Sequence, residues 1–541
     1  MKHYPRVGAL ALLAVLALPA QKLDPVQMLQ QAKALQQKRQ YQDANNIYRQ
    51  LVADYPDRAD IRVAWGRLYL EHWQGDVASD LFQEALKIHP DDANALLGLA
   101  LLEAQEFGGK AAQLAQAALK SDPHLVEAQE LLARLALEDN NETRARDEAH
   151  KALDMDSKSV QGRAILASMD WLAGKQDTTW DPHDARGYET AAHFFMLNRR
   201  YTESIAYYRK AIALDPDLYT ARSQLGINLM RVGQLDEARQ VLEECWNNGY
   251  QDTPTKNSLK LLDSFKNFVT FKTDNTILKL HQKEADLLHP YFESEMKKII
   301  ATYEKKYKFK LTQPVQVEVY PDHDDFAVRT LGLPGLGALG VTFNYSIAMD
   351  SPSGRTPGEF HWAYTLWHEM SHVFTLNMTN SKIPRWFTEA IAVHEETAAN
   401  PEWGDRISPD EILAIRDHKL LPIEEFDRGF IHPSYPQQVI VSYYQGGKIV
   451  DYITDKWGWD TILAMIHDFG NGEATTAVIQ KELHISPSDF NKQFLEYIDR
   501  ETSQTVSHFN EWKDGMKKLI DLAQKKDDDG VIKQGLAIRD M

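Results

Sequence analysis

The sequence predicts an N-terminal all-α solenoid, followed by an α+β domain and a short helical C-terminal tail. Three observations lead to this fold class. Small residues recur at intervals close to 34 residues up to about residue 257. Short alternating apolar stretches, typical of strands, lie between residues 268 and 350. Apolar residues at three- and four-residue spacing then surround His368 and His372, which indicates a buried helix.

The first twenty residues have the pattern of a secretory signal peptide. Lys2 and Arg6 precede an apolar run at 7–18, and Ala20 offers a small residue before Gln21. The run is short for a transmembrane helix, and no later stretch of about 18 apolar residues follows. We therefore expect a signal peptide at residues 1–20, no transmembrane span after its cleavage, and a secreted or periplasmic protein. A retained interfacial anchor is the alternative.

The chain is acidic. Its formal net charge of −18 includes Lys2 and Arg6, so the chain from residue 21 onward carries −18 − 2 = −20. This charge favours solubility and argues against nucleic acid or anionic lipid as the main partner. The single cysteine, Cys245, excludes intramolecular disulfides, and we expect it to pack inside a helix pair.

Residues 21–257 contain an internal repeat. Each unit has a small residue twelve positions before its end, and in four of the six units the end is a proline. The small residues are Ala44, Ala78, Ala111, Ala145, Ser204 and Ala238. A small side chain lets the second helix of one unit approach the next unit, and proline ends that helix. The one long interval, 59 residues, predicts a lone helix at 160–173 and a loop at 175–186.

The segments 211–216 and 235–238 resemble tetratricopeptide repeats, whose period is about 34 residues. This resemblance implies a solenoid whose groove binds protein partners or peptide substrate, or docks the domain that follows.

Residues 258–505 change in character. We expect strands at 268–272, 276–281 and 314–321, and a helix at 285–307. After a glycine-rich loop, residues 341–350 predict one further strand. In the tail, residues 506–541, helices are expected at 516–523 and 530–537, as a partial repeat or as a helical cap.

Residues 368–372 form an HExxH motif. Because His368 and His372 lie one helical turn apart on the same face, they can hold one Zn²⁺ at about 2.0–2.1 Å. Glu369 is rotated by about 100° from His368, so its carboxylate can reach a water activated by the metal without binding the metal itself.

Glu389 is the candidate third ligand. Sixteen residues separate it from His372, and it lies in an apolar helix predicted after Pro384. A carboxylate among apolar residues is costly unless a positive charge compensates it, as a metal would. Glu395 and Glu396 are the alternative ligands.

The HExxH motif and residues 384–392 resemble the gluzincin metallopeptidases, in particular bacterial peptidase MA-like domains found beside tetratricopeptide repeats. The second segment follows the pattern P-x-W-[LF]-x-E-G-x-A, with Ala390 in place of the usual glycine. The resemblance covers about residues 260–500. It implies an α+β metallopeptidase fold, zinc as cofactor, Glu369 as general base, and an edge strand that pairs with substrate.

Two further features bear on the reaction that this resemblance implies. Residues 337–341 lack the acid with which aminopeptidases hold an N-terminal amine, which favours cleavage within the substrate chain. A gluzincin tyrosine can donate its hydroxyl to the oxyanion, and Tyr443 fits that position best, with Tyr444 as the alternative.

The expected function is therefore an exported zinc endopeptidase acting on peptide or unfolded protein, with repeats that bind substrate or a separate partner. Two alternatives belong to other classes. One is a repeat-based binding scaffold with a degenerate peptidase domain. The other is an envelope-protein assembly factor that cleaves only misfolded clients.

Overall fold

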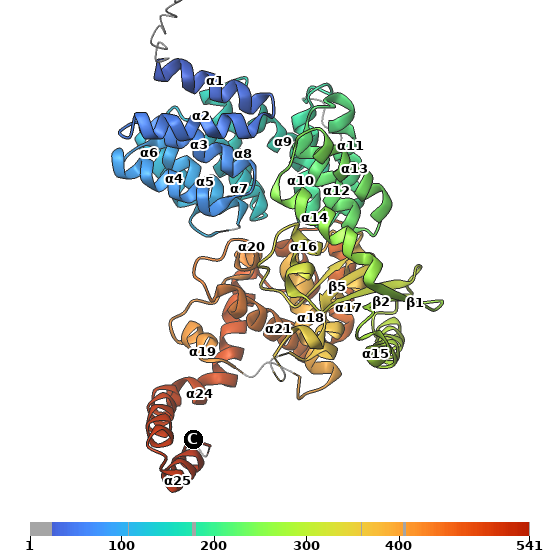
Figure 1. The fold of residues 1–541 in the computed structure, drawn as a ribbon. Helices are drawn as coiled ribbons and strands as arrows, with labels where there is room; N and C mark the ends of the chain where they lie inside the picture. The colour runs from blue at the N-terminus through green and yellow to red at the C-terminus, as the bar shows by residue number, and fades with distance from the viewer. Residues whose placement is uncertain are drawn as a thin grey trace, which may run out of the picture.

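The computed structural model describes residues 24–106, 108–175, 180–356, 358, 360–403 and 407–539. The predicted signal peptide lies outside these residues. Within the described part, no helix has the length and apolar character needed to cross a bilayer. Figure 1 shows a helical solenoid above a mixed α/β domain, with a helical tail extending below.

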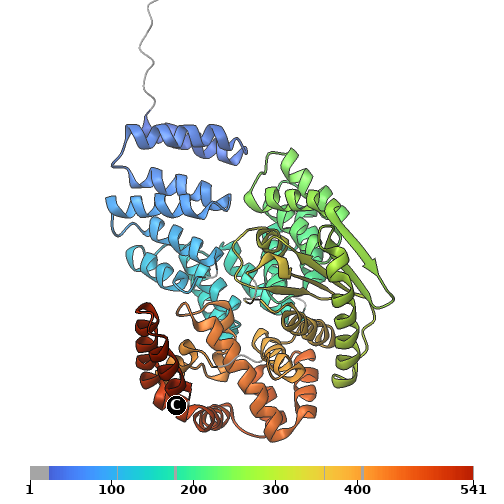
Figure 2. The ribbon, with the colours of Figure 1, turned by 60° about the horizontal axis from the view of Figure 1, so that its bottom comes forward.

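The solenoid consists of consecutive helices that pack as hairpins (Figures 1 and 2). They are α1 (Pro25–Gln37), α2 (Tyr41–Asp54), α3 (Ala59–Glu71), α4 (Gly75–Ile88), α5 (Ala93–Gln105), α6 (Ala111–Ser121), α7 (Val126–Glu138), α8 (Glu142–Met155), α9 (Val160–Leu172), α10 (Ala185–Leu197), α11 (Tyr201–Leu214), α12 (Tyr219–Arg231), α13 (Leu235–Asn247) and α14 (Thr253–Ser264). The six small residues of the repeat are at most 1% exposed, which confirms their predicted place between helices.

Phe82 of α4 shows how neighbouring units approach so closely. Its ring is fully buried and lies between Gly66 of α3 and Gly98 of α5. A Cβ at these glycines would lie 2.7 and 2.4 Å from the ring, closer than side-chain contacts permit. The ring therefore fills the space that the two missing side chains leave.

The long interval between repeats contains the predicted lone helix, since α9 ends within one residue of the expected bound. Helix α9 packs against both α8 and α10 and so keeps the solenoid continuous. Cys245 of α13 is fully buried beside Tyr219 and Tyr250, which confirms its packing role.

The first and last repeats touch each other. Arg39, in the turn after α1, lies over the ring of Tyr219 at 4.2 Å from its centroid and 3.5 Å from the carboxylate of Asp217. The carbonyl of His72 accepts hydrogen bonds from the backbone N–H and hydroxyl of Thr253, at 3.4 and 3.1 Å. These contacts join the two ends of the solenoid, a closure that the repeat spacing does not predict.

The α/β domain is built on a five-stranded sheet in the order β1-β2-β3-β5-β4. The outer pairs β1–β2 and β4–β5 are antiparallel, whereas β2–β3 and β3–β5 are parallel. The strands are β1 (Phe268–Lys272), β2 (Thr276–His281), β3 (Val315–Tyr320), β4 (Gly340–Phe343) and β5 (Ser346–Asp350). The first three agree with the sequence to within one residue.

The prediction of one strand at 341–350 is wrong. The chain turns back at Asn344, which has a positive φ of 55°, and the two halves pair as the β4–β5 hairpin. Both halves are apolar enough to form a strand, and asparagine tolerates the left-handed conformation that the turn needs. The hairpin makes β4 an edge strand.

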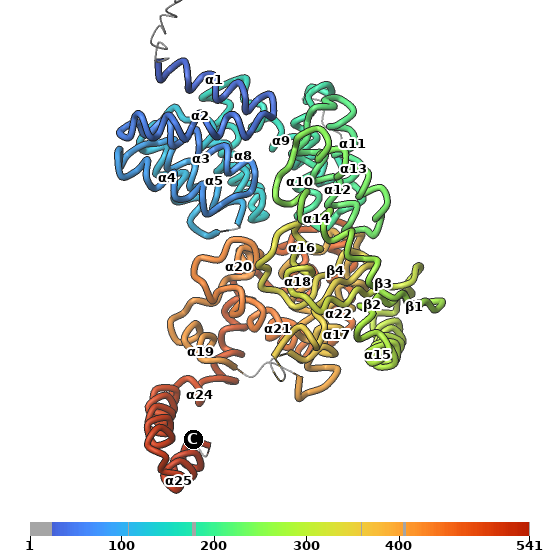
Figure 3. The backbone as a smooth tube through the Cα atoms, in the orientation of Figure 1, coloured from blue at the N-terminus to red at the C-terminus, as the bar shows by residue number. Residues whose placement is uncertain are grey.

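Helices cover the sheet and complete the domain (Figure 3). They are α15 (Ala285–Lys306), α16 (His323–Leu331), α17 (Trp362–Thr379), α18 (Arg385–Ala399), α19 (Pro409–Arg416), α20 (Arg428–Ile431), α21 (Gln438–Trp457), α22 (Trp459–Gly470) and α23 (Thr475–Leu483), with 3₁₀ turns at Phe265–Asn267, Pro352–Gly354 and Ile423–Glu425. Helix α17 packs on β4, β5, α15, α18 and α22, so the HExxH motif lies in the centre of the core.

The tail differs from the sequence expectation. Residues 516–523 do not form a separate helix but end the 38-residue helix α24 (Pro487–Gln524). The expected helix at 530–537 lies within α25 (Asp528–Arg539). The expected domain limits at 257 and 505 fall inside α14 and α24, respectively.

Candidate metal centre

Two capped helices hold the candidate ligands. Helix α17 begins after His361, whose ring accepts a hydrogen bond from the first turn, and it ends at Asn380 with a φ of 49°. Helix α18 begins after Pro384, whose φ of −62° suits a helix start. Asp427 Oδ1 accepts a hydrogen bond from the backbone N–H of Trp386 at 2.9 Å and so satisfies one of the free donors there.

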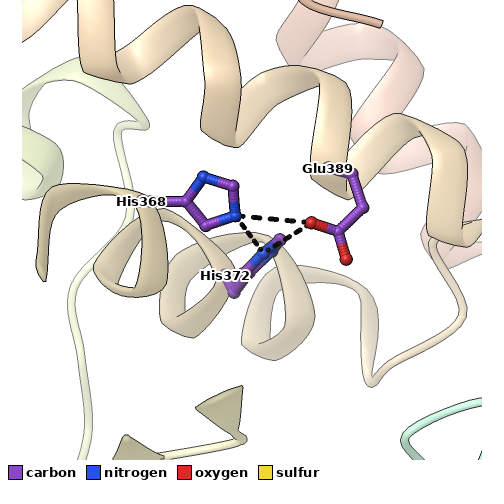
Figure 4. Close-up of side chains that lie close together, drawn as sticks. All are labelled: His368, His372 and Glu389. Carbon is purple, nitrogen blue, oxygen red and sulfur yellow. Dashed lines mark hydrogen bonds and ion pairs between the residues drawn. The ribbon is translucent and has the colours of Figure 1, made fainter. Parts of the chain in front are cut away.

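Three predicted ligand atoms converge between these helices (Figure 4). Nε2 of His372 lies 3.2 Å from Nε2 of His368 and 3.1 Å from Oε2 of Glu389, and the remaining pair is 3.4 Å apart. Ligands bound tetrahedrally to zinc at about 2.0–2.1 Å lie about 3.3–3.4 Å from one another. The spacing of these atoms therefore fits a single zinc ion.

The other nitrogen of each imidazole has its own partner. Nδ1 of His368 lies 2.5 Å from Oε1 of Glu396, and Nδ1 of His372 lies 2.7 Å from the hydroxyl of Thr388. That hydroxyl is in turn 2.8 Å from the hydroxyl of Thr375. Such contacts fix the ring orientation and leave both Nε2 atoms directed at the common point.

The two alternative ligands have different places. Glu396 lies behind His368, where it orients the ring rather than meeting the other ligand atoms. Glu395 is bound by the ammonium of Lys306 at 2.7 Å and the hydroxyl of Tyr307 at 3.0 Å. The orienting role of Glu396 was not predicted from the sequence, although its spacing of seven residues from Glu389 places both on one face of α18.

Negative charge exceeds positive charge at this centre. Glu369, Glu389 and Glu396 are 5%, 2% and 1% exposed, and the partly buried Arg199 supplies one positive charge against them. The four side chains together carry a formal charge of −3 + 1 = −2 when all are ionised. A divalent cation would balance them, so the donor set fits zinc in charge as well as in spacing.

The pKa values of the two imidazoles are shifted in opposite directions. Burial lowers the pKa of His372 to about 4, although Glu389 has the opposite effect. This ring is therefore neutral near pH 7. Burial also lowers the pKa of His368, but its contacts with Glu389 and Glu396 outweigh burial and raise it well above the usual value. Burial raises the pKa of Glu389, yet His372 and Arg199 hold it well below its usual range. His372 is neutral, as a metal-ligating imidazole must be, whereas the glutamates favour a positive charge at His368.

Glu369 lies against the edge strand. Its Oε2 accepts a hydrogen bond from the hydroxyl of Thr342 on β4 at 2.6 Å. Gly340, two residues earlier on the strand, leaves room for its Oε1. Burial raises the pKa of Glu369, with smaller lowering effects from His368 and Thr342.

The two candidate tyrosines point to different places. The ring of Tyr443 lies 6.2 Å from the ring of His368 and packs edge-on against Phe430. Burial raises the pKa of its hydroxyl, and the next largest effect comes from Glu389. Tyr444 is buried on another side of α21, where Glu411 is the nearest strong influence on its pKa after burial.

Ala390 replaces the glycine of the usual segment, and Gly446 accommodates the change. Ala390 is fully buried where α18 packs against α21. A Cβ at Gly446 would lie 3.1 Å from the Ala390 methyl and 3.2 Å from its Cα. The methyl group thus fits because the opposing helix has no side chain there.

Arg199 lies in the solenoid but contacts Glu389 of the centre, and the sequence alone did not predict this contact. It lies in the turn between α10 and α11, and its Nη2 donates to Oε1 of Glu389 at 2.6 Å. No local pattern marks this residue, because the contact depends on how the solenoid sits on the α/β domain.

Comparison with known proteins agrees with this architecture. Residues 296–498 match the Peptidase MA superfamily, and residues 35–102 and 195–255 match tetratricopeptide repeats. Similar solved structures include a tetratricopeptide repeat protein from Parabacteroides merdae, with 18% identity over 44% of this chain and 98% of that chain and a TM-score of 0.30. Another is YrrB, described as a repeat protein with an unusual peptide-binding site, with 16% identity over 37% and 90% and a TM-score of 0.22. PilF from Pseudomonas aeruginosa has 16% identity over 42% and 95% and a TM-score of 0.25.

The family matches support a peptidase or protein-binding role. The chain combines an N-terminal tetratricopeptide repeat solenoid with a domain of the Peptidase MA superfamily.

Proposed function

We propose that this chain is an exported zinc endopeptidase that acts on peptide or unfolded protein substrates. The observation that carries the proposal is the convergence of the ligand atoms of His368, His372 and Glu389 within 3.1–3.4 Å of one another, with Glu369 beside them. A zinc ion held by these three residues would supply a Lewis acid that polarises the scissile carbonyl and activates a water molecule.

Glu369 is the general base in this proposal. Its Oε2 is held by Thr342, which leaves Oε1 to take a proton from the attacking water. Burial raises the pKa of this carboxylate and so makes it a stronger base than an exposed glutamate. The same carboxyl group then passes the proton to the leaving amine. General acid–base catalysis contributes typically about 10²–10⁴-fold.

Tyr443 is the proposed oxyanion donor. Its ring lies on the His368 side of the centre, and its hydroxyl keeps its proton because burial raises the pKa. A hydroxyl that stays protonated can donate a hydrogen bond to the carbonyl oxygen as negative charge develops on it.

The edge strand β4 is the proposed binding site for the substrate backbone. It pairs with β5 on one side only, so its other edge can accept an added strand. A peptide paired there would pass Glu369, which contacts Thr342 of the same strand. Main-chain pairing along an extended segment suits cleavage within a chain.

The repeats are proposed to bind the substrate or a protein partner. A hollow of about 640 Å³ lies along α1, α3 and α5 in the solenoid. Most of the residues that line it have polar side chains, among them Lys33, Gln36, Tyr48, Asp60, Arg67 and Asp92. Side chains of this kind can hydrogen-bond an extended peptide.

The test compares wild type with Glu369→Gln on unfolded casein and measures the zinc content of both. We expect about one zinc per chain in both proteins, and turnover lower by about 10²–10⁴-fold in the variant. Equal turnover would remove Glu369 from the mechanism. If zinc-loaded wild type cleaved none of a broad set of substrates, the alternative of a repeat-based binding scaffold would be favoured. Export is tested separately, because loss of residues 1–20 shortens the precursor by about 2 kDa.

A further inference from the structure

Arg199 belongs to the repeat solenoid and contacts the candidate metal centre. It lies 190 residues before Glu389 in the chain, in the turn between α10 and α11. Its side chain is 17% exposed, and its Nη2 donates to Oε1 of Glu389 at 2.6 Å. The contact therefore joins two domains at a predicted metal ligand.

The turn that carries Arg199 is held firmly by its neighbours. Nη1 of Arg200 donates to the carbonyl of Leu172 at 2.7 Å, and its guanidinium lies over the ring of Phe195. Nδ2 of Asn198 donates to the carbonyl of Phe194 at 2.8 Å. Because the flanking residues are anchored in the solenoid, the position of Arg199 follows the position of α10 and α11.

Glu389 divides its two oxygens between different partners. Oε1 faces Arg199, while Oε2 faces the Nε2 atoms of His368 and His372. Arg385, one turn earlier on α18, lies farther from Oε1, at 3.8 Å, and its side chain is 43% exposed. Arg199 is therefore the closer of these two cations to the carboxylate.

The second terminal nitrogen of Arg199 indicates that this residue does more than join the two domains. Nη1 is buried and has no hydrogen-bond partner among the described residues. Burying a cation with an unsatisfied donor costs free energy. A contact that served only to join the domains could use apolar residues without the cost of burying these charges.

We propose that Arg199 is a positioning residue that the repeat solenoid supplies to the metal centre. By holding Oε1 of Glu389, it keeps Oε2 directed at the two imidazoles. The centre is complete only when the solenoid is seated on the peptidase domain. This inference rests on the proposed function, since it concerns the same three ligands.

The test uses the full chain with Arg199→Ala and Arg199→Lys. The matched control is Arg222→Ala, because Arg222 is similarly buried at 12% exposure but pairs with Glu244 inside the solenoid. Zinc affinity is measured by chelator competition on metal-free protein, alongside the unfolding temperature and turnover of casein. Removal of groups that orient metal ligands typically costs about 10–100-fold in metal affinity or activity.

We expect Arg199→Ala to weaken zinc binding by about 10–100-fold, Arg199→Lys by less, and the control to stay within about twofold of wild type. Added guanidinium, below denaturing concentrations, should restore part of the zinc affinity of Arg199→Ala but not affect the control. Equal zinc affinity in Arg199→Ala and the control would overturn the proposal while leaving the zinc peptidase intact. A rise in turnover would also overturn it, because Arg199 would then obstruct the site. A wild type that binds no zinc would instead contradict the proposed function.

Discussion

Gly340 of the edge strand lies directly against Glu369 of the HExxH helix. A Cβ at Gly340 would stand 2.7 Å from Cγ and 2.8 Å from Oε1 of Glu369. Glu369 cannot easily give way, because it is buried and its Oε2 is held by Thr342. The proposed general base therefore contacts β4, the strand proposed to bind the substrate, at a position where only glycine fits.

We expect Gly340→Ala to lower kcat by about 10²-fold, since displacing a catalytic group by about 1 Å can cost that much. Zinc content should be unchanged, because the atoms nearest to an added Cβ belong to Glu369 and Thr365 and not to a ligand. Gly337→Ala is the matched control, as a Cβ at Gly337 would meet no atom within 4 Å. Steady-state kinetics on casein with metal analysis make the measurement. Similar kcat values for the two variants would contradict this account of Glu369.

Glu396 and Glu395 are neighbours in the chain with separate roles in the structure. Glu396→Ala removes the partner of His368 Nδ1 and should weaken zinc binding by about 10–100-fold. Glu395→Ala breaks the contacts with Lys306 and Tyr307, so it should lower the unfolding temperature but leave zinc affinity unchanged. Chelator competition and thermal unfolding of both variants distinguish the two effects. The reverse pattern would show that Glu395, and not Glu396, supports the metal.

Local patterns in the sequence predicted the repeat helices, the helices α15, α17 and α18, three of the strands and the set of candidate ligands. A spacing of four residues places His368 and His372 on one helix face whatever the rest of the fold does. The repeat is equally local, because each helix of the solenoid packs mainly on the helices next to it in the chain. These features could be predicted because they depend on nearby residues.

Features that depend on distant residues could not be predicted in this way. Arg199 reaches Glu389 only because the solenoid is seated on the peptidase domain. The β4–β5 hairpin could not be predicted locally, because both halves are apolar and the turn takes only two residues, of which Asn344 has a positive φ. Thr342 contacts Glu369 as a result of that turn. The contacts of Arg199 and Thr342 with the site therefore became visible only in the structure.

Ala390 and Gly446 form a complementary pair that can be exchanged. Gly446→Ala alone should push α21 away from α18, lower the free energy of unfolding by about 1–3 kcal/mol and reduce turnover, because Tyr443 lies on α21. The double variant Ala390→Gly with Gly446→Ala again has one methyl group at this contact, now carried by α21. It should recover most of the lost stability and turnover. Denaturant unfolding and kinetics of both single variants and the double variant complete the cycle. Additive losses would mean that the two positions are not coupled.

His432 of the peptidase domain meets acidic residues at the end of α7 in the solenoid. Its Nδ1 contacts the carboxylate of Asp139, and its Nε2 lies 3.4 Å from Oε2 of Glu138. Arg134 and His193 also face Glu138, at 3.4 and 3.1 Å. The cluster therefore links the two domains through a protonated histidine.

The pH dependence of this link follows from the pKa values of its members. Burial lowers the pKa of His432, but Asp139 and Glu138 outweigh burial and raise it from 6.5 to about 9. The contribution of His432 to stability is therefore fully present below about pH 6.5 and is lost as pH rises through about 9. Burial raises the pKa of Glu138, but Arg134 and the two histidines outweigh it and hold the pKa well below 4.5. Its contribution is present above about pH 4.5 and is lost as pH falls through that lowered pKa.

We expect His432→Gln to lower the unfolding temperature most near pH 6, with the difference from wild type shrinking towards pH 10. The effect at pH 6 is at most about 3 kcal/mol, since one pKa unit corresponds to about 1.4 kcal/mol and partial exposure weakens the pair. Thermal unfolding at a series of pH values makes the measurement, with the exposed His183→Gln as control. A difference between wild type and His432→Gln that stays constant across this range would show that the histidine charge does not stabilise the contact between the domains.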